Sequence, residues 1–357
     1  MNERIFTFDG STIRSIAISP IDTNLLAVGL SDGSVRICDR LTNNTLKTIQ
    51  VERGIMVDSV VFSSNGKELL AGMGRSRWRL WNFANNTLAT AQTFQRAGNA
   101  VDVVFSPDNT RIAAIHEDGV VISTIRPRTT NTLACPEPSC VAYSADGRHL
   151  ACGTCDALVV VWDMTSLSAD RRRPYNTMLG HTERVYSVAF PPNDSSTLAS
   201  ASGDGSIRFW NVETCLQISI YRYMSPIYSI SFAPRGTHLA SSHMDDSIHI
   251  WSVKSVRRVR RLLGHKDGVF AIIYSPCNNY LLSASSDATA RVWPLLDARL
   301  PSIAIVLMAH NVAPYVVLDV LDFYMADVEQ NTWQDESEFH HFEKIRLLER
   351  LRRRLRN

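Results

Sequence analysis

Residues 180–211 have the sequence GHTERVYSVAFPPNDSSTLASASGDGSIRFWN. Short apolar segments alternate here with turn-forming residues, of which the tightest group is Gly203-Asp204-Gly205. Segments of this length, rich in β-branched and aromatic residues and bounded by Gly, Pro, Asn and Asp, predict antiparallel strands. The expected strands are 185–190, 197–202, 206–211 and, just beyond the quoted stretch, 215–221. The stretch therefore predicts one four-stranded unit.

This unit recurs along the chain. Asp204 stands in the tight turn, and Trp210 follows it by six residues. The corresponding pairs are Asp32 and Cys38, Arg75 and Trp81, Asp118 and Thr124, Asp156 and Trp162, Asp245 and Trp251, and Asp287 and Trp293. A large apolar residue precedes each turn by 13 or 14 residues: Ile18, Phe62, Phe105, Tyr143, Phe190, Phe232 and Tyr274. Two separate features with one period indicate seven repeats.

A four-stranded unit of this size cannot bury both faces alone, so such units stack around an axis as the blades of a β-propeller. We therefore predict an all-β, seven-bladed propeller over residues 1–294. The seventh repeat ends near Trp293 without a fourth strand, which would leave an unpaired edge. The segment from Ile5 to Phe8 precedes the first full repeat, and we expect it to pair beside 289–293 and close the ring.

The repeats resemble the WD-repeat β-propeller family. Gly180-His181, Asp204 and Trp210-Asn211 match its signature, Gly264-His265, Asp287 and Trp293-Pro294 are similar, and Trp162-Asp163 is the Trp-Asp pair itself. The resemblance implies a hydrogen-bonded network of His, turn Asp and Trp that stabilises the turns within a blade. The residues with this implied structural role are His181, Asp204, Trp210, His265, Asp287, Trp293, Asp156, Trp162, Asp245 and Trp251. The first three repeats depart from the signature at Cys38, Arg75 and Thr124.

The resemblance also implies that the protein binds other proteins or peptides through a wide top face. This face is formed by the connections from outer to inner strands and by the tight turns. The candidate contact residues on it are Thr12, Arg53, Met73, Asn99, His116, Arg184, Ser225, His243 and Asp267. The alternative for each is ordinary surface, because a minority of interface residues contributes most of the binding energy. We expect a non-catalytic interaction scaffold within a multiprotein complex.

Residues 295–357 lack the repeat and predict an α-helical C-terminal extension. Pro314 precedes one helical pattern over 315–324, and Ser337 is a candidate N-cap for a second helix that ends near Arg354. These helices either pack on the propeller or dock a partner. The segment 314–321 resembles the leading helix of F-box and related ubiquitin-ligase adaptor boxes, without their Leu before Pro. This resemblance implies an alternative function, the substrate receptor of a ubiquitin ligase that docks through residues 295–357.

No motif for catalysis stands out, since a phosphate-binding loop and a His-Glu-x-x-His are both lacking. We expect no enzymatic activity, cofactor or metal. Cys152 and Cys155 have the spacing of metal or redox pairs, but they fall in a strand and its turn, where small cysteines usually pack. Two arginine groups, 171–173 and Arg257, Arg258, Arg260 and Arg261, suit either a solvated edge or an anionic ligand such as a phosphoinositide.

The net charge is +2 over 357 residues, so the composition creates no general demand for nucleic acid. No stretch approaches 18 apolar residues, which predicts no membrane span. The first residues lack the features of a secretory signal peptide, and the seven scattered cysteines suit a reducing compartment. We expect a cytoplasmic or nuclear protein.

Overall fold

The computed structural model describes residues 4–74, 77–83, 87–93, 102–117, 119–125, 129–165 and 176–295. The expected C-terminal helices, the arginines at 171–173 and the candidate contact residue Asn99 lie outside the described residues.

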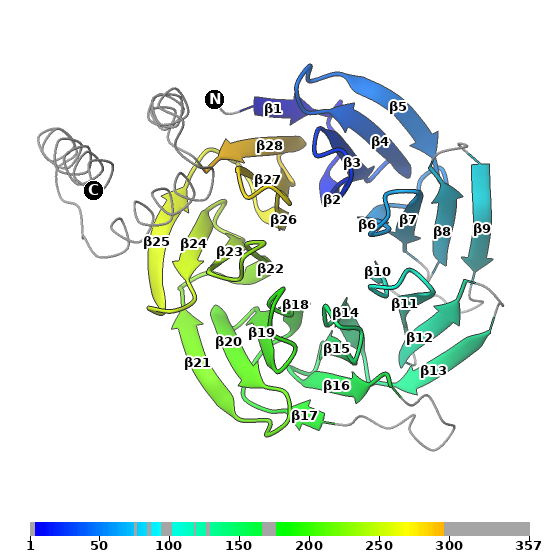
Figure 1. Cartoon of the computed structure of the whole chain (residues 1–357). Helices are drawn as coiled ribbons and strands as arrows, with labels where there is room; N and C mark the ends of the chain where they lie inside the picture. The colour runs from blue at the N-terminus through cyan, green and yellow to red at the C-terminus, as the bar shows by residue number, and fades with distance from the viewer. Residues whose placement is uncertain are drawn as a thin grey trace, which may run out of the picture. The chain divides into compact units, whose positions relative to one another are not determined.

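Seven four-stranded antiparallel sheets stand around a central axis, as Figure 1 shows, so the prediction of a seven-bladed propeller is confirmed. Blade 1 consists of β2 (Ile13–Ile18), β3 (Leu25–Leu30), β4 (Ser34–Asp39) and β5 (Thr45–Gln50). Blade 2 consists of β6 (Val57–Phe62), β7 (Glu68–Met73), β8 (Arg77–Asn82) and β9 (Thr87–Thr93). Blade 3 consists of β10 (Val103–Phe105), β11 (Arg111–His116), β12 (Gly119–Thr124) and β13 (Thr130–Ala134).

The remaining blades repeat this order, with the first strand of each blade innermost. Blade 4 consists of β14 (Pro138–Tyr143), β15 (His149–Thr154), β16 (Val159–Asp163) and β17 (Asn176–Met178). Blade 5 consists of β18 (Val185–Ala189), β19 (Thr197–Ser202), β20 (Ser206–Asn211) and β21 (Gln217–Arg222). Blade 6 consists of β22 (Ile227–Phe232), β23 (His238–His243), β24 (Ile248–Ser252) and β25 (Arg257–Leu262). Blade 7 consists of β26 (Val269–Tyr274), β27 (Tyr280–Ser285), β28 (Thr289–Pro294) and β1 (Arg4–Thr7).

The ring is closed by the N-terminal strand, as the repeat pattern predicted. Strand β1 pairs antiparallel with β28, in a register that runs from Arg4 opposite Val292 to Thr7 opposite Thr289. The amide of Phe8 extends this ladder to the carbonyl of Ala288 at 3.2 Å. Because the chain's first strand completes its last blade, β28 has no unpaired edge.

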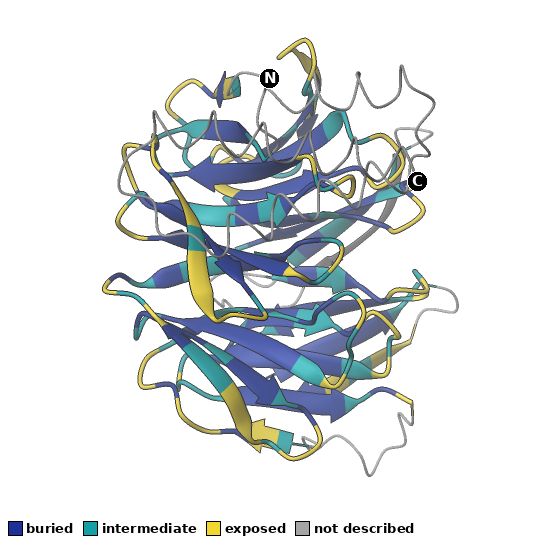
Figure 2. Ribbon diagram, turned by 60° about the vertical axis from the view of Figure 1, so that its left-hand side comes forward, coloured by how far each residue is buried: buried dark blue, intermediate teal, exposed yellow. Residues whose placement is uncertain are grey.

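The apolar core is divided among the blade interfaces. Each of the seven buried clusters combines residues of two neighbouring blades, for example Phe209 and Tyr221 of blade 5 with Phe232 and Trp251 of blade 6. Figure 2 shows the burial in the inner strands and the exposure at the turns and outer strands. Among the described residues, no helix is long and apolar enough to cross a membrane.

Candidate functional site: the central cavity and its mouth

The His, Asp and Trp of blade 5 meet at a serine. His181 Nδ1 lies 2.9 Å from Asp204 Oδ2, and His181 Nε2 lies 2.7 Å from Ser200 Oγ. The indole Nε1 of Trp210 donates to the same Ser200 oxygen at 2.8 Å. Burial raises the pKa of the Asp204 carboxyl, but hydrogen bonds from His181 and Ser206 outweigh this and hold it below its ordinary value. All these groups are therefore engaged inside the blade.

Blade 7 repeats the arrangement with His265, Asp287, Ser283 and Trp293, at distances of 2.9, 2.7 and 2.8 Å. Burial again raises the pKa of the Asp287 carboxyl, and hydrogen bonds from Thr289 and from the amide of Lys266 bring it down to about 2. The imidazole rings of His181 and His265 are buried. Their geometry supports a structural role for both sets.

Blade 6 has a similar hydrogen-bond network, but other residues form part of it. Trp251 Nε1 donates to Ser241 Oγ at 2.7 Å, as in the other two blades. Asp245 accepts a hydrogen bond at 2.9 Å from the hydroxyl of Tyr223, so a tyrosine takes the place of the histidine. His243 Nε2 lies 2.8 Å from Ser241 Oγ, and the His243 ring packs 4.5 Å from that of His249.

Blade 4 lacks the network. Cys152 stands ten residues before Trp162, where Ser200, Ser241 and Ser283 precede their tryptophans. Trp162 is buried, and its Nε1 has no hydrogen-bond partner in the part of the chain that the structure describes. Asp156 is exposed, and no hydrogen bond joins it to Trp162 within the described part of the chain. The network implied for Asp156 and Trp162 is thus not formed, because the hydroxyl that would link the indole is replaced by a thiol.

The candidate contact residues do not all reach the surface. Arg53 and Asp267 are exposed, whereas Thr12, His116 and Arg184 are half-buried. Ser225 is buried, and its hydroxyl accepts the amide of Asp245 at 3.1 Å. Met73 and His243 are 0% exposed, so predicting them as contact residues was wrong. Met73 fills the core between blades 1 and 2, and His243 packs inside blade 6.

Cysteines in and beside blade 4 are packed in the core, and the arginines of blade 6 lie on its outer strand. Cys135 and Cys152 are buried with their sulfurs 3.7 Å apart, and burial raises the pKa of Cys140 to about 12. No group of three or more potential metal ligands gathers among the described residues. The four arginines of β25 line the exposed outer strand, where Arg261 approaches Asp245 at 3.9 Å.

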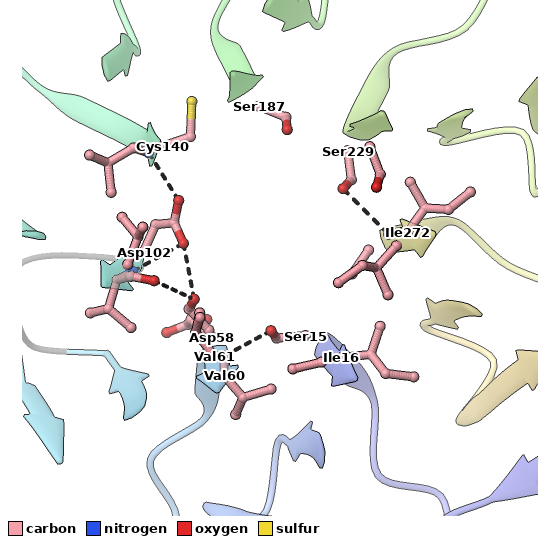
Figure 3. A pocket seen from close by; sticks show the side chains of 18 of the residues that line it. Ser15, Ile16, Asp58, Val60, Val61, Asp102, Cys140, Ser187, Ser229 and Ile272 are labelled. Atoms are coloured by element: carbon pink, nitrogen blue, oxygen red, sulfur yellow. Dashed lines mark hydrogen bonds between the residues drawn. The ribbon is translucent and has the colours of Figure 1, made fainter. Parts of the chain in front are cut away.

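A cavity of about 730 Å³ occupies the axis of the ring and is lined by the innermost strands. Hydrogen bonds join neighbouring blades around it (Figure 3): Ser15 Oγ accepts from the amide of Val60 at 2.9 Å, and Ser229 Oγ accepts from that of Ile272 at 3.3 Å. Asp102 joins three blades, since its carboxylate accepts at 3.0 Å from Ser59 Oγ and from the amides of Val103 and Val141. Burial raises the pKa of Asp102, and these donors oppose that rise.

Three aromatic rings lie side by side at the mouth of this cavity. The ring centroids of Tyr186 and Tyr228 are 5.1 Å apart, and those of Tyr228 and Phe270 are 5.0 Å apart. We call these three residues, from blades 5, 6 and 7, the aromatic arc. A guanidinium covers each end: Arg184 lies 5.3 Å from the centroid of Tyr186, and Arg14 of blade 1 lies 4.1 Å from that of Phe270. All five side chains line the cavity.

Sequence reasoning found Arg184 but missed the arc and Arg14. Each missed residue is the second residue of an inner strand, at a bulge in the pairing with the next strand. A bulge redirects the side chain of the extra residue. Alignment of the repeats at this position gives Arg14, Asp58, Ser139, Tyr186, Tyr228 and Phe270. This column, with its three aromatic residues, is the signal that could have identified the mouth.

Seven four-stranded blades, closed by the first strand and stabilised by repeated His, Asp, Ser and Trp contacts, define a β-propeller built from sequence repeats. The family model described as WD domain, G-beta repeat matches residues 2–39, 129–163, 172–211, 215–252 and 256–294. These segments make up more than half of the chain. The chain therefore belongs to the WD-repeat family.

Two kinds of relative illustrate the similarity. The chain is 29% identical to Cell division cycle 20.5, cofactor of APC complex, from Arabidopsis thaliana, over 76% of this chain and 62% of that protein. It is 27% identical to Anaphase-promoting complex subunit cdc20 from Dictyostelium discoideum, over 77% of this chain and 56% of that protein. A guanine nucleotide-binding protein subunit beta from Zea mays is 26% identical, over 60% of each chain. The chain spans about three fifths of the length of the curated relatives it matches.

A solved structure supports the same fold. A chain in the crystal structure of the mitotic checkpoint complex superposes with a TM-score of 0.72, covering 82% of this chain and 91% of that one. The two sequences are 22% identical, so the likeness concerns the fold alone.

Proposed function

We propose that the protein is a non-catalytic interaction propeller that works as a subunit of a multiprotein complex and binds its partner at the cavity mouth. The observation that carries this proposal is the aromatic arc with Arg14 and Arg184, a half-buried aromatic surface flanked by cations. Aromatic and arginine side chains are the types most enriched in binding hot spots. The carboxylate of Asp102, by contrast, is engaged by three donors from its own chain.

The relatives support a role in an assembly. Two of them carry names that make them a cofactor or a subunit of the anaphase-promoting complex, and a third is a subunit of a guanine nucleotide-binding protein. We extend to this chain only the general feature that these names share, membership of a larger complex. Its place of action under this proposal is the cytoplasm or the nucleus.

The proposal is tested by the native size of the protein. The tagged full-length chain, isolated from the cells that make it, should elute in a complex well above the 39.9 kDa of the chain itself. Tyr228→Ala should shift it toward the free chain, because this residue is the centre of the arc. Arg148→Ala is the control, since Arg148 is exposed in the turn between β14 and β15, at the opposite end of the inner strands. Elution of the wild-type chain alone would contradict the proposal.

A second candidate is the substrate receptor of a ubiquitin ligase that docks through residues 295–357. The relatives named for the anaphase-promoting complex favour it. Full-length chain should then capture ligase components, and a chain that ends at residue 294, after β28, should lose them while it keeps any partner bound at the mouth. Equal recovery of ligase components by both chains would assign the docking to the propeller instead.

A further inference from the structure

The two guanidiniums at the cavity mouth lack acidic partners. No salt bridge joins Arg14 or Arg184 to a carboxylate among the described residues, and the Nε of Arg184 is buried without a hydrogen-bond partner. Elsewhere on the same face, Arg77 and Arg79 both reach Glu52. A guanidinium has five N–H donors and no acceptor, so the half-buried Arg184 and the exposed Arg14 are both able to bind an anionic group of a ligand.

The acidic groups near the mouth form no salt bridge with Arg14 or Arg184 among the described residues. Within the cavity lining, Asp102 is occupied by its three donors, and Asp58 of blade 2 forms no salt bridge with either arginine in the described part of the chain. The carboxylates of Asp246 and Asp267 belong to the surrounding turns rather than to the lining. Their negative charges repel any further acidic residues of a ligand. The residues next to its two acidic groups should therefore be neutral or basic.

The arc fixes the spacing of the ligand. The three rings of the arc lie in order between the two guanidiniums. Each neighbouring pair of groups along this row is 4.1 to 5.3 Å apart. This row is at most about 20 Å long, and an extended peptide rises about 3.3 Å per residue, so the side chains that reach both ends are at most about six positions apart. Successive side chains point to opposite faces, so an even spacing is needed, and with a spacing of four the long side chains of two glutamates cover the remaining distance. The rings between the arginines offer a surface on which an apolar or aromatic side chain can pack.

We propose that the cavity mouth binds an extended peptide segment in which two acidic residues, four positions apart, flank an aromatic residue. One carboxylate pairs with Arg184 and the other with Arg14, and the central side chain packs on Tyr228. This inference deepens the proposed function and rests on it, since it states the chemistry of the partner at the same site.

The test is a titration of the full-length protein with a fluorescent peptide, Ser-Glu-Ala-Phe-Ala-Glu-Ser, blocked at both ends. Its two glutamates are four positions apart. A peptide with glutamine at both positions should bind at least about tenfold more weakly, because each pair is a charge-assisted contact. A peptide with adjacent glutamates should bind equally poorly. Equal affinity for all three peptides would overturn the proposal.

Variants identify the site. Arg14→Glu should weaken binding about tenfold or more and should restore it toward a peptide in which the corresponding glutamate is lysine. Arg148→Ala is the matched control and should leave the affinity unchanged, with thermal unfolding of each variant confirming the fold. Loss of binding without rescue by the lysine peptide would contradict the assignment. Competition by inorganic phosphate at equal concentration would show a general anion site instead of a peptide site.

The two proposals fail in different ways. If the Arg14→Glu, Arg184→Glu protein keeps its native complex, the acidic-peptide inference is wrong and the scaffold function stands. If the wild-type chain binds the peptide but elutes alone from its cells, the scaffold function is wrong and the peptide site stands.

Discussion

Ile5 lies directly opposite Arg291 in the antiparallel pair of β1 and β28, so residues almost 290 positions apart close the ring. Beside it, Phe6 is 4% exposed and packs in the cluster between blades 7 and 1, whereas Ile5 is 40% exposed. The backbone ladder, the buried Phe6 and hydrogen bonds to blade 1 together hold the closing strand. One of these bonds runs from Asn43 Nδ2 to the carbonyl oxygen of Ile5 at 3.1 Å.

Phe6→Ala should destabilise the propeller strongly. Removal of a buried phenylalanine side chain costs about 3–5 kcal/mol, from lost transfer free energy and from the cavity left behind. The free energy of unfolding, obtained by urea titration, checks this value. Ile5→Ala should lower it by less than about 1 kcal/mol, because that side chain faces solvent. Equal losses for both variants would show that burial of the Phe6 side chain does not hold the closing strand.

Ser200→Ala should destabilise blade 5 by about 2–4 kcal/mol, because two buried groups lose one shared hydroxyl. The Trp210 indole loses its acceptor, and His181 Nε2 loses its contact. Thermal unfolding measures the effect. Ser255→Ala, at an exposed serine in the turn before β25, should change the melting temperature little. Similar shifts for the two variants would refute a structural role for the network.

Cys152→Ser should stabilise the protein by about 1 kcal/mol, since it offers a hydroxyl to the unpartnered indole of Trp162. Serine already has this role before Trp210, Trp251 and Trp293. Urea titration of Cys152→Ser against Cys155→Ser, a change in the adjacent turn, isolates the gain. A loss of stability at position 152 would mean that the packing of the thiol beside Cys135 outweighs the new hydrogen bond.

Stability should fall between pH 7 and pH 5 because of two histidines in blade 6. Burial lowers the pKa of His243 to about 4 and that of His249 to about 3, from 6.5 in the unfolded chain, and Arg258 and Arg261 add to the effect while Asp245 opposes it. The unfolded chain therefore takes up protons first as the pH falls. The contribution of these rings to the free energy of unfolding is complete above pH 6.5 and is progressively lost as the pH falls toward 4.

Urea titrations at several pH values between 7.5 and 5 measure this slope. The pKa values of Asp204 and Asp287 are lowered from 3.8, the value in the unfolded chain. These two carboxylates therefore change the free energy of unfolding mainly at a pH below that window. His249→Gln should flatten the slope, whereas Ser255→Ala, which removes no titratable group, should keep it. An unchanged slope in His249→Gln would assign the pH dependence to other groups.

The number of blades, the strand positions and the closing segment could all be predicted from the sequence. Tight turns and apolar strands are local features, and each repeat carries its own copy, so Asp204 with Trp210 or Asp287 with Trp293 is recognisable without the other blades. The networks around His181 and His265 were implied by the resemblance of these repeats to the WD-repeat family.

The candidate site could be predicted only in part. Met73 and His243 stand beside turns, yet the neighbouring blade covers the first and the ring of His249 covers the second. Burial between blades depends on the side chains of two repeats at once, which the spacing within one repeat does not contain.

The sequence by itself determined the repeating sheet, because turn and strand preferences act over a few residues. Only the tertiary structure decided which side chains meet on the axis. Closure brings Arg14, Tyr186, Tyr228 and Phe270 from four blades to one cavity, and bulges direct them into it. Their proximity arises from the geometry of the ring, because more than 40 residues separate each from the next along the chain.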